Sequence, residues 1–188
     1  MPIFNNEITF IHIPKTGGTS IEKFLQSKGY RMSMWVPNPS VLINGHTPQH
    51  STYKELESLN LLTDKIFTVV RPEIERCISE YYYLKKWKTK ASELFNSFDG
   101  FLDLFLDKDN YQLFDYHNMP NKDFITNKFG EIDSRIKIID FFNIKEIEDY
   151  LQESGLSNFH EFKSSEGVPL QLLLSSNQQQ RILDFYQI

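Results

Sequence analysis

The sequence predicts an α/β fold, with a mainly parallel central sheet flanked by helices. Strand-like apolar runs at 7–13, 65–70 and 136–141 are each followed by a helical pattern, and this alternation is typical of parallel sheets. The 188 residues are enough for one buried core but too few for two full domains. The composition, 40% hydrophobic and 24% charged, is that of a globular protein. We therefore expect residues 1–188 to form a single domain.

The N-terminal part of the chain predicts a strand, a helix and a second strand. In residues 7–13 polar and apolar side chains first alternate and then give way to a mainly apolar run that ends at a proline. This pattern is typical of a buried strand that leads into a loop. Thr19 and Ser20 can cap the helix that follows, and a glycine can end it. The second strand is expected at 30–36, before the turn-rich stretch 37–45.

The middle of the chain predicts a short helix, a strand and a long helix. Thr52 and Glu55 have the spacing of a capping box, which favours a helix start at this point. Residues 65–70 form the most strongly apolar strand. The proline after Arg71 favours a helix at 72–88, because proline suits the first position of a helix.

The remainder of the chain predicts three helices and one strand. An amphipathic helix is expected at 98–106, and the stretch 109–127 has no clear period and is interpreted as a long functional loop. The strand at 136–141 is followed by helices at 145–154 and 170–187.

Charge and cysteine content exclude several classes of function. The net charge of −5 argues against binding nucleic acid independently of sequence, because such binding needs a basic surface. Cys77 is the only cysteine, so an internal disulfide and a cysteine-based zinc site are excluded. No group of His, Asp and Glu has a recognisable metal-ligand spacing, so no metal is expected. Without a signal-like segment or a membrane-length apolar run, we expect a cytoplasmic protein with no membrane span.

The loop PKTGGTS after the first predicted strand has the components of an anion-binding site. Its glycines allow close backbone approach, the next helix offers free amides at its N-terminus, and the lysine supplies a full charge. The candidate binding residues are Lys15, Thr16, Gly17, Gly18, Thr19 and Ser20. A Walker A lysine follows its glycines, whereas this lysine precedes them, so a nucleoside triphosphate loop is not indicated.

A second candidate anion site begins where the strand at 65–70 ends. The guanidinium of Arg71 can place two N–H groups on one phosphate, and Ser79 lies two helical turns further along the chain. Ligands of parallel sheets bind beyond the carboxyl ends of the strands, and the Lys15 loop also follows a strand. The two sites can therefore face one ligand.

Together these motifs resemble the sulfotransferases that use 3′-phosphoadenosine 5′-phosphosulfate (PAPS), in particular the glycan branch that includes the heparan sulfate 2-O-sulfotransferases. HIPKTGGTS resembles their 5′-phosphosulfate loop, and FTVVRPEIERCISEYYYL resembles their 3′-phosphate motif, with Pro72-Glu73 where many relatives have Asp-Pro. The resemblance implies a P-loop-like sulfotransferase fold. It also implies metal-free transfer of a sulfuryl group from PAPS to an acceptor hydroxyl, by default on a glycan or lipid-linked sugar, with small molecules and tyrosine as other acceptors.

The resemblance also implies catalytic roles. Lys15 would neutralise the charge that grows on the bridging oxygen. His46, in the segment LINGHTPQH, would take the acceptor proton, because Gly-His resembles the segment that supplies the base in the glycan branch. Histidine suits this role since its ordinary pKa, about 6.5, is near the working pH. His50, His117 and a carboxylate are alternative bases. His117 and Asn121 also resemble a segment that lies near cofactor and acceptor in relatives.

Other notable residues are given structural or secondary roles. His12 is expected to pack inside the first strand, Arg76 to be structural, and the run Tyr81–Tyr83 to pack in the core. The basic stretch Lys85–Lys90 can steer an anionic ligand or simply favour the negative end of a helix dipole.

Two other functions are consistent with the same motifs. A non-catalytic protein could bind the 3′-phosphorylated nucleotide without transferring any group. A P-loop-type nucleotide kinase would share the α/β layout, but it would need magnesium and a Walker lysine.

Overall fold

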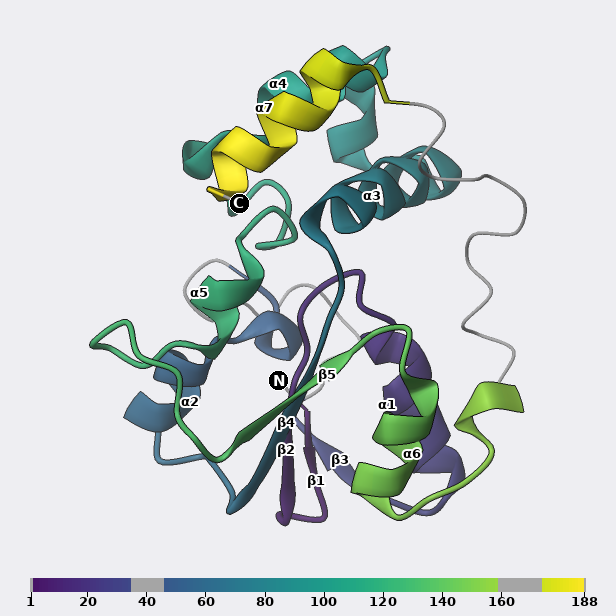
Figure 1. Ribbon diagram of the computed structural model, residues 1–188, viewed down its shortest axis with the longest axis vertical. Helices are drawn as coiled ribbons and strands as arrows, with labels where there is room; N and C mark the ends of the chain where they lie inside the picture. Colours follow the sequence, from purple (N-terminus) through teal and green to yellow (C-terminus); the bar gives the residue numbers. More distant parts are fainter. Residues whose placement is uncertain (1, 35–45, 159–173, 188) are drawn as a thin grey trace.

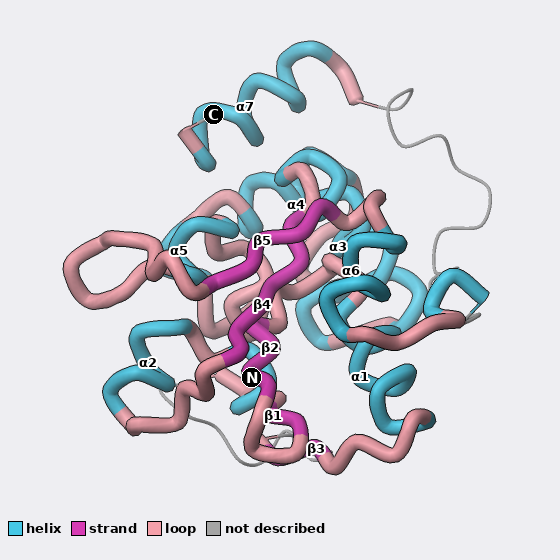
Figure 2. Tube along the Cα trace, turned by 60° about the horizontal axis from the view of Figure 1, so that its bottom comes forward, coloured by secondary structure: helices cyan, strands magenta, loops and turns pink. Residues whose placement is uncertain are grey.

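Five strands form the central sheet of the computed structural model, which describes residues 2–34, 46–158 and 174–187. The order of the strands in the sheet is β3-β1-β2-β4-β5, as Figure 2 shows. Their bounds are β1 Ile3–Phe4, β2 Ile8–Ile11, β3 Met32–Ser33, β4 Lys65–Val70 and β5 Ile136–Asp140. The strands predicted at 65–70 and 136–141 are thus confirmed, and the first predicted strand is shorter than expected.

The sheet is mixed, so the prediction of a mainly parallel sheet is wrong. β2, β4 and β5 run parallel to one another, but β1 pairs antiparallel with both β2 and β3. β1 was not predicted because two residues are too few to show a period. Asn5 and Asn6 take φ values of 52° and 59° in the connection from β1 to β2. Asparagine tolerates this left-handed conformation, and the Asn pair that follows Ile3–Phe4 was the available hairpin signal.

Seven α-helices lie in the described part of the chain. They are α1 Gly18–Ser27, α2 Tyr53–Ser58, α3 Glu73–Trp87, α4 Phe98–Phe105, α5 Asn121–Ile125, α6 Ile144–Leu151 and α7 Ser176–Tyr186. α2 starts at the predicted capping box of Thr52 and Glu55. α5 lies inside the stretch predicted as a loop, 109–127. None of these helices is long and apolar enough to cross a lipid bilayer.

Parts of three predicted segments fall outside the described residues. The second predicted strand, 30–36, corresponds to Met32–Ser33 within the described chain. The turn predicted at 37–45 is outside it, and the last predicted helix is described only from Ser176.

Helices cover both faces of the sheet (Figure 1). α1 and α6 pack on one face, in a core that includes Phe10, Phe24 and Ile147. α2 and α5 pack on the other face, in a core that includes Ile11 and Phe124. Neighbouring residues of β2 enter different cores because side chains of a strand alternate between its two faces.

A third group of helices lies beyond the carboxyl ends of β2 and β4 (Figure 1). α3 leads away from β4 and packs with α4 and α7 around Phe101, Phe105 and Ile182. In the parallel pair β2 and β4, Ile11 lies opposite Thr68, so both strands end at the same edge of the sheet. The helix α1 follows β2 and α3 follows β4, and the space between these connections contains the candidate site.

Candidate active site

A pocket of about 810 Å³ lies where β2 and β4 end. Most of the residues predicted to bind an anion line it, namely Lys15, Gly17, Gly18, Thr19, Ser20, Arg71 and Ser79. The structure therefore brings the two predicted anion sites to one cavity. Two predicted site residues, Thr16 and His46, are not among the residues that line it.

The loop before α1 presents its backbone to this pocket. Gly17 is the residue before α1 and has a φ of 80°, a conformation that glycine adopts without strain. The amides of Gly18 and Thr19 donate no hydrogen bond to a residue that the structure describes. Lys15 has a φ of 67°, which is strained for a side chain of this kind and is typical of functional sites. Free amides at a helix N-terminus favour an anion.

The ammonium group of Lys15 is held between an aromatic ring and a carboxylate. Its Nζ lies 3.8 Å from the centre of the Tyr83 ring and 4.0 Å from Oε2 of Glu80. Burial lowers the pKa of Lys15 against the opposing effect of Glu80, and Arg71 adds to the lowering. The lysine is thus a partly desolvated cation beside the free amides.

Arg71 and Ser79 come from the connection that follows the neighbouring strand: Arg71 lies just after β4 and Ser79 lies within α3. Nε of Arg71 donates to Oε2 of Glu75 at 3.2 Å, and Nη1 lies 3.4 Å from the Lys15 carbonyl oxygen. Nη2 of Arg71 and the Ser79 hydroxyl make no hydrogen bond within the described chain. These two groups can therefore donate to a ligand.

Two of the three hydroxyl side chains of the loop, those of Thr16 and Ser20, differ in what they can bind. Thr16 donates its hydroxyl hydrogen to the carbonyl oxygen of Ile13 at 2.8 Å, so this side chain braces the loop from within. Ser20 is buried and lines the pocket, and its hydroxyl has no partner among the described residues. Of the pair, Ser20 is the one whose side chain can reach a ligand.

Three histidines form a row along one wall of the pocket. The ring centres of His12 and His50 are 5.3 Å apart, and those of His50 and His117 are 4.8 Å apart. Each Nδ1 is within hydrogen-bond distance of a carboxylate: Glu22 for His12, Asp115 for His50 and Glu80 for His117. Three histidine-carboxylate pairs thus border the anion loop.

His50 has the arrangement of a neutral proton acceptor. Its Nδ1 lies 2.8 Å from Oδ2 of Asp115, and Nε2 has no partner among the described residues. Burial lowers the pKa of His50 to about 4, against the opposing hydrogen bond to Asp115. Asp115 is itself fixed by the Thr47 amide and hydroxyl at 2.6 and 2.8 Å. Burial raises its pKa, but the hydrogen bond and charge of His50, the charge of His117 and the Thr47 amide together outweigh it, so the pKa is lowered.

The predicted base, His46, is not among the residues that line the pocket. It is fully buried, and its Nδ1 and Nε2 lie 2.8 Å from the Thr47 carbonyl oxygen and 3.1 Å from Oε1 of Glu55. Burial lowers the pKa of His46, but the bonds to Glu55 and Thr47 outweigh it, so the pKa is raised. The structure therefore does not bring His46 to the pocket, whereas it brings His50 and His117 there.

Two expectations about neighbouring residues are wrong. His12 does not pack inside a strand, because β2 ends at Ile11 and His12 lines the pocket. Of the tyrosine run, Tyr82 and Tyr83 are 41% and 39% exposed and line the pocket. Tyr81 alone packs against the core around α3 and α4, as predicted.

Arg76 has the structural role that its sequence position suggested. This buried side chain donates hydrogen bonds to the carbonyl oxygens of Pro14 and His117 at 3.1 and 3.0 Å. Asn121 accepts from Arg76 at 3.0 Å and donates to the Arg71 carbonyl oxygen at 2.9 Å. Asn121 thus supports the pocket from outside it.

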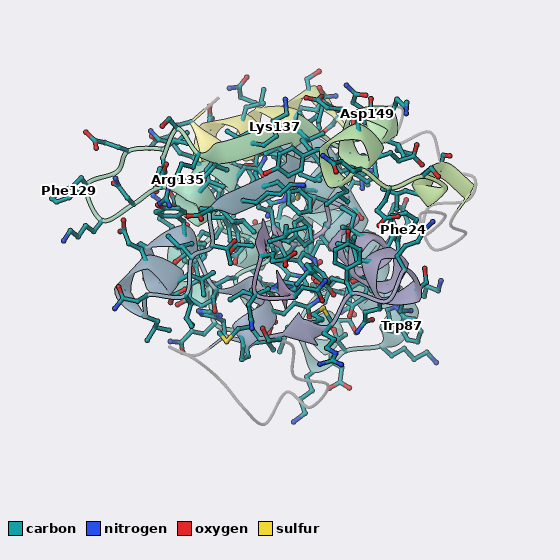
Figure 3. The ribbon with its side chains drawn as sticks, turned by 90° about the horizontal axis from the view of Figure 1, so that it is seen from below. Phe24, Trp87, Phe129, Arg135, Lys137 and Asp149 are labelled. Carbon is teal, nitrogen blue, oxygen red and sulfur yellow. The ribbon has the colours of Figure 1, made fainter. Side chains whose placement is uncertain are left out.

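The outer part of the pocket is formed by the second half of α3 and the residues after it. Tyr82, Lys86, Trp87 and Lys90 line this part. Trp87 is 64% exposed and lies at the periphery of the molecule (Figure 3). The predicted basic stretch Lys85–Lys90 therefore contributes two cations and an aromatic face to the mouth of the pocket.

One cluster in the pocket has the composition of a metal site. Ligand atoms of His50, Asp115 and His117 all lie within 4.8 Å of one another, so these residues can hold a divalent cation. Positions 50, 115 and 117 have no sequence spacing that is typical of a metal motif, which is why the cluster was not predicted.

Comparison with known proteins gives no relative from which a function of the pocket could be inferred. No protein-family model matches the chain, and neither curated protein sequences nor solved structures include a match to it.

Proposed function

We propose that this protein is a sulfotransferase with a P-loop-like sulfotransferase fold, which moves a sulfuryl group from PAPS to an acceptor hydroxyl. The observation that carries the proposal is that the Lys15 loop shares one pocket with Arg71 and Ser79. PAPS has two anionic ends, a 5′-phosphosulfate and a 3′-phosphate, and the pocket has two separate groups of unpartnered donors.

Each end of the donor has a set of partners in this proposal. The 5′-phosphate binds the amides of Gly18 and Thr19 and the hydroxyl of Ser20, because these donors have no acceptor among the described residues. The 3′-phosphate binds the guanidinium of Arg71 and the hydroxyl of Ser79. Thr16 braces the loop instead of binding the ligand.

The reaction is an in-line displacement at sulfur. The acceptor oxygen forms a bond to sulfur while the bond from sulfur to the bridging oxygen breaks, and the electron pair of that bond stays on the 5′-phosphate. Lys15 neutralises the charge that develops on the bridging oxygen. A preorganised, partly desolvated cation is effective in this role because it does not have to reorient during the reaction.

We assign the base to His50 instead of His46. Its free Nε2 takes the acceptor proton, and Asp115 orients the ring through Nδ1. His46 has both ring nitrogens in hydrogen bonds to Glu55 and Thr47 and does not line the pocket. His117 is the alternative base within the pocket, since its Nδ1 is likewise held by a carboxylate, Glu80.

The acceptor proposed here is a carbohydrate, either a glycan or a lipid-linked sugar. The mouth of the pocket supports this choice because Trp87 and Tyr82 offer aromatic faces on which a sugar ring can lie. Lys86 and Lys90 would add affinity for an acidic sugar.

Two assays test the proposed function. Calorimetry should show that 3′-phosphoadenosine 5′-phosphate (PAP), the product nucleotide, binds at least tenfold more tightly than AMP or ATP with magnesium. Radiolabelled PAPS should then transfer sulfate to hydroxyl acceptors. If PAP binds no more tightly than AMP, the proposal is wrong. Tight PAP binding without transfer to any acceptor would identify a non-catalytic binding protein, and preference for ATP with magnesium would identify a kinase.

A further inference from the structure

The cluster of His50, Asp115 and His117 has a spacing close to that of a bound metal ion. One ring nitrogen of each histidine and one carboxylate oxygen of Asp115 all lie within 4.8 Å of one another. A tetrahedral zinc ion holds its nitrogen and oxygen ligands roughly 3.3 Å apart, so small side-chain movements would complete such a site. All three residues line the pocket, and a metal bound by three side chains keeps a further coordination position open to it.

His117 is oriented as metal-bound histidines are. Its Nδ1 lies 2.8 Å from Oε2 of Glu80, a carboxylate that is only 1% exposed. Nε2 of His117 has no hydrogen-bond partner in the described part of the chain. Histidines that bind a metal through one nitrogen commonly donate the hydrogen of the other to a carboxylate, which fixes the ring. Glu80 therefore supports the site without being one of the three ligands.

His50 gives a second, independent sign of a ligand. The residue is only 7% exposed and lines the pocket, and yet its Nε2 has no partner among the described residues. Its Nδ1 lies 2.8 Å from Oδ2 of Asp115 and 3.3 Å from Oγ1 of Thr47. The Thr47 amide and hydroxyl also hold the Asp115 carboxylate in place. A polar atom that is left unpaired in so buried a place is costly, and a bound cation would remove that cost.

We infer that His50, Asp115 and His117 form a binding site for a divalent transition-metal ion, with zinc as the ion that best fits the ligands. Imidazole nitrogens suit zinc, whereas magnesium and calcium prefer sites built of oxygen atoms. The charges around the site also favour a cation. The carboxylates of Asp115 and Glu80 are opposed by the one ammonium group of Lys15, which lies 4.0 Å from Glu80.

Zinc at this site inhibits the protein. This consequence rests on the proposed function, in which His50 is the base, whereas the metal binding does not. Zinc on Nε2 of His50 covers the atom that accepts the proton. Zinc on Nδ1 leaves the hydrogen of the neutral ring on Nε2, which then cannot accept a second one. Bound zinc and sulfate transfer therefore exclude each other, and a chelator should restore activity.

A substitution of Asp115 tests the binding site. Asp115→Asn removes the charged ligand, and asparagine tolerates the φ of 50° at this position, so the fold should be kept. Zinc affinity, measured by competition with a chromophoric chelator, should fall about 10- to 100-fold. Asp109→Asn, at an exposed acid of the preceding turn, is the matched control and should bind zinc as the parent protein does. Equal zinc affinity in Asp115→Asn and the parent protein would overturn the inference.

The histidines provide a second comparison. His117→Gln should weaken zinc binding at least as much as Asp115→Asn, whereas His46→Gln should not weaken it, because His46 does not line the pocket. An equal loss in both histidine variants would place the metal elsewhere and overturn the inference. The parent protein needs no variant: cobalt(II) should show the intense visible absorption of a four-coordinate site, and added zinc should abolish it. Only the weak absorption of six-coordinate cobalt would contradict the site.

An activity assay tests the inhibition separately. Zinc should stop the transfer of labelled sulfate from PAPS with a midpoint at its measured dissociation constant, and a chelator should reverse the effect. Full activity or stimulation at saturating zinc would overturn the inhibitory role. If no acceptor receives sulfate from PAPS, the proposed function fails, and the zinc affinities of the parent protein and Asp115→Asn still decide whether the metal site exists.

Discussion

The two sides of the pocket are built in different ways. The side proposed to hold the donor consists of two continuous segments, PKTGGTS after β2 and the stretch from Arg71 to Ser79 after β4. The side proposed to hold the base consists of histidines that are paired with carboxylates from other segments, as His50 is with Asp115. In the proposed function, anion binding depends mainly on backbone and local geometry, whereas proton transfer depends on side chains that only the fold brings together.

The strongest test of the donor side is the removal of its lysine. Lys15→Ala should lower kcat for sulfate transfer on the order of 10³-fold, because a preorganised charge at the leaving oxygen is lost. Much of the affinity for PAP should remain, since the amides and Arg71 are unchanged. Kinetics with labelled PAPS and calorimetry measure the two effects. Lys54→Ala, at an exposed position of α2, is the matched control. Wild-type turnover in Lys15→Ala would refute the assigned role.

The strongest test of the base side compares two histidines that lie four positions apart. His50→Gln should lower kcat about 10²-fold, which is the usual loss when a general base is removed. His46→Gln should reduce thermal stability by breaking the bond to Glu55, but it should leave kcat of the folded protein nearly unchanged. The opposite pattern would return the role of base to His46.

The arginine of the donor side should affect binding more than turnover. Arg71→Ala should weaken PAP binding about ten- to hundredfold, because a charged hydrogen-bond donor to the 3′-phosphate is lost. Binding of AMP should change little, since AMP has no 3′-phosphate. Ser79→Ala should give a smaller loss of the same kind. Calorimetry with both nucleotides tests this selectivity, and an equal loss for PAP and AMP would show that Arg71 does not bind the 3′-phosphate.

The pH profile gives the smallest expected effect and distinguishes the same two histidines. A base acts only when it is unprotonated, so protonation removes activity as the pH falls through its pKa. With its pKa lowered to about 4, His50 stays neutral from pH 8 to pH 5, and kcat/KM should be nearly constant over that range. His46, whose pKa is raised above its ordinary value, would instead lose activity within this range as the pH falls. A chelator in the buffer keeps divalent cations off His50 and Asp115 during the measurement.

The contrast between the two sides also explains which features the sequence could predict. The bounds of β4 and the capping box at Thr52 were predictable because a short run of residues determines each of them. The loop at Lys15 is local in the same sense, because its proposed role as an anion site rests on seven adjacent residues. β1 was missed because it is only two residues long, and with it the mixed character of the sheet.

The row of His12, His50 and His117 along the pocket could not be predicted in the same way. Glu80 comes from α3, whereas Asp115 and His117 lie two positions apart in the segment before α5, and no spacing connects either segment to His50. Sequence reasoning chose His46 because it follows a glycine, but burial and the bond to Glu55 decide which histidine is available. His12 lies two positions before the loop, but its position in the apolar run predicted a place inside the strand.

The hydrogen bonds of Arg76 have a consequence for how substitutions combine. A single guanidinium holds the carbonyl oxygen of the residue before Lys15 and that of His117. The loop that carries the lysine and the segment that carries the histidine therefore share one buried anchor. Free-energy changes from substitutions in these two segments should not be additive, because groups in one hydrogen-bond network are thermodynamically coupled. The two sides of the pocket differ in origin, but they will respond to mutation as one unit.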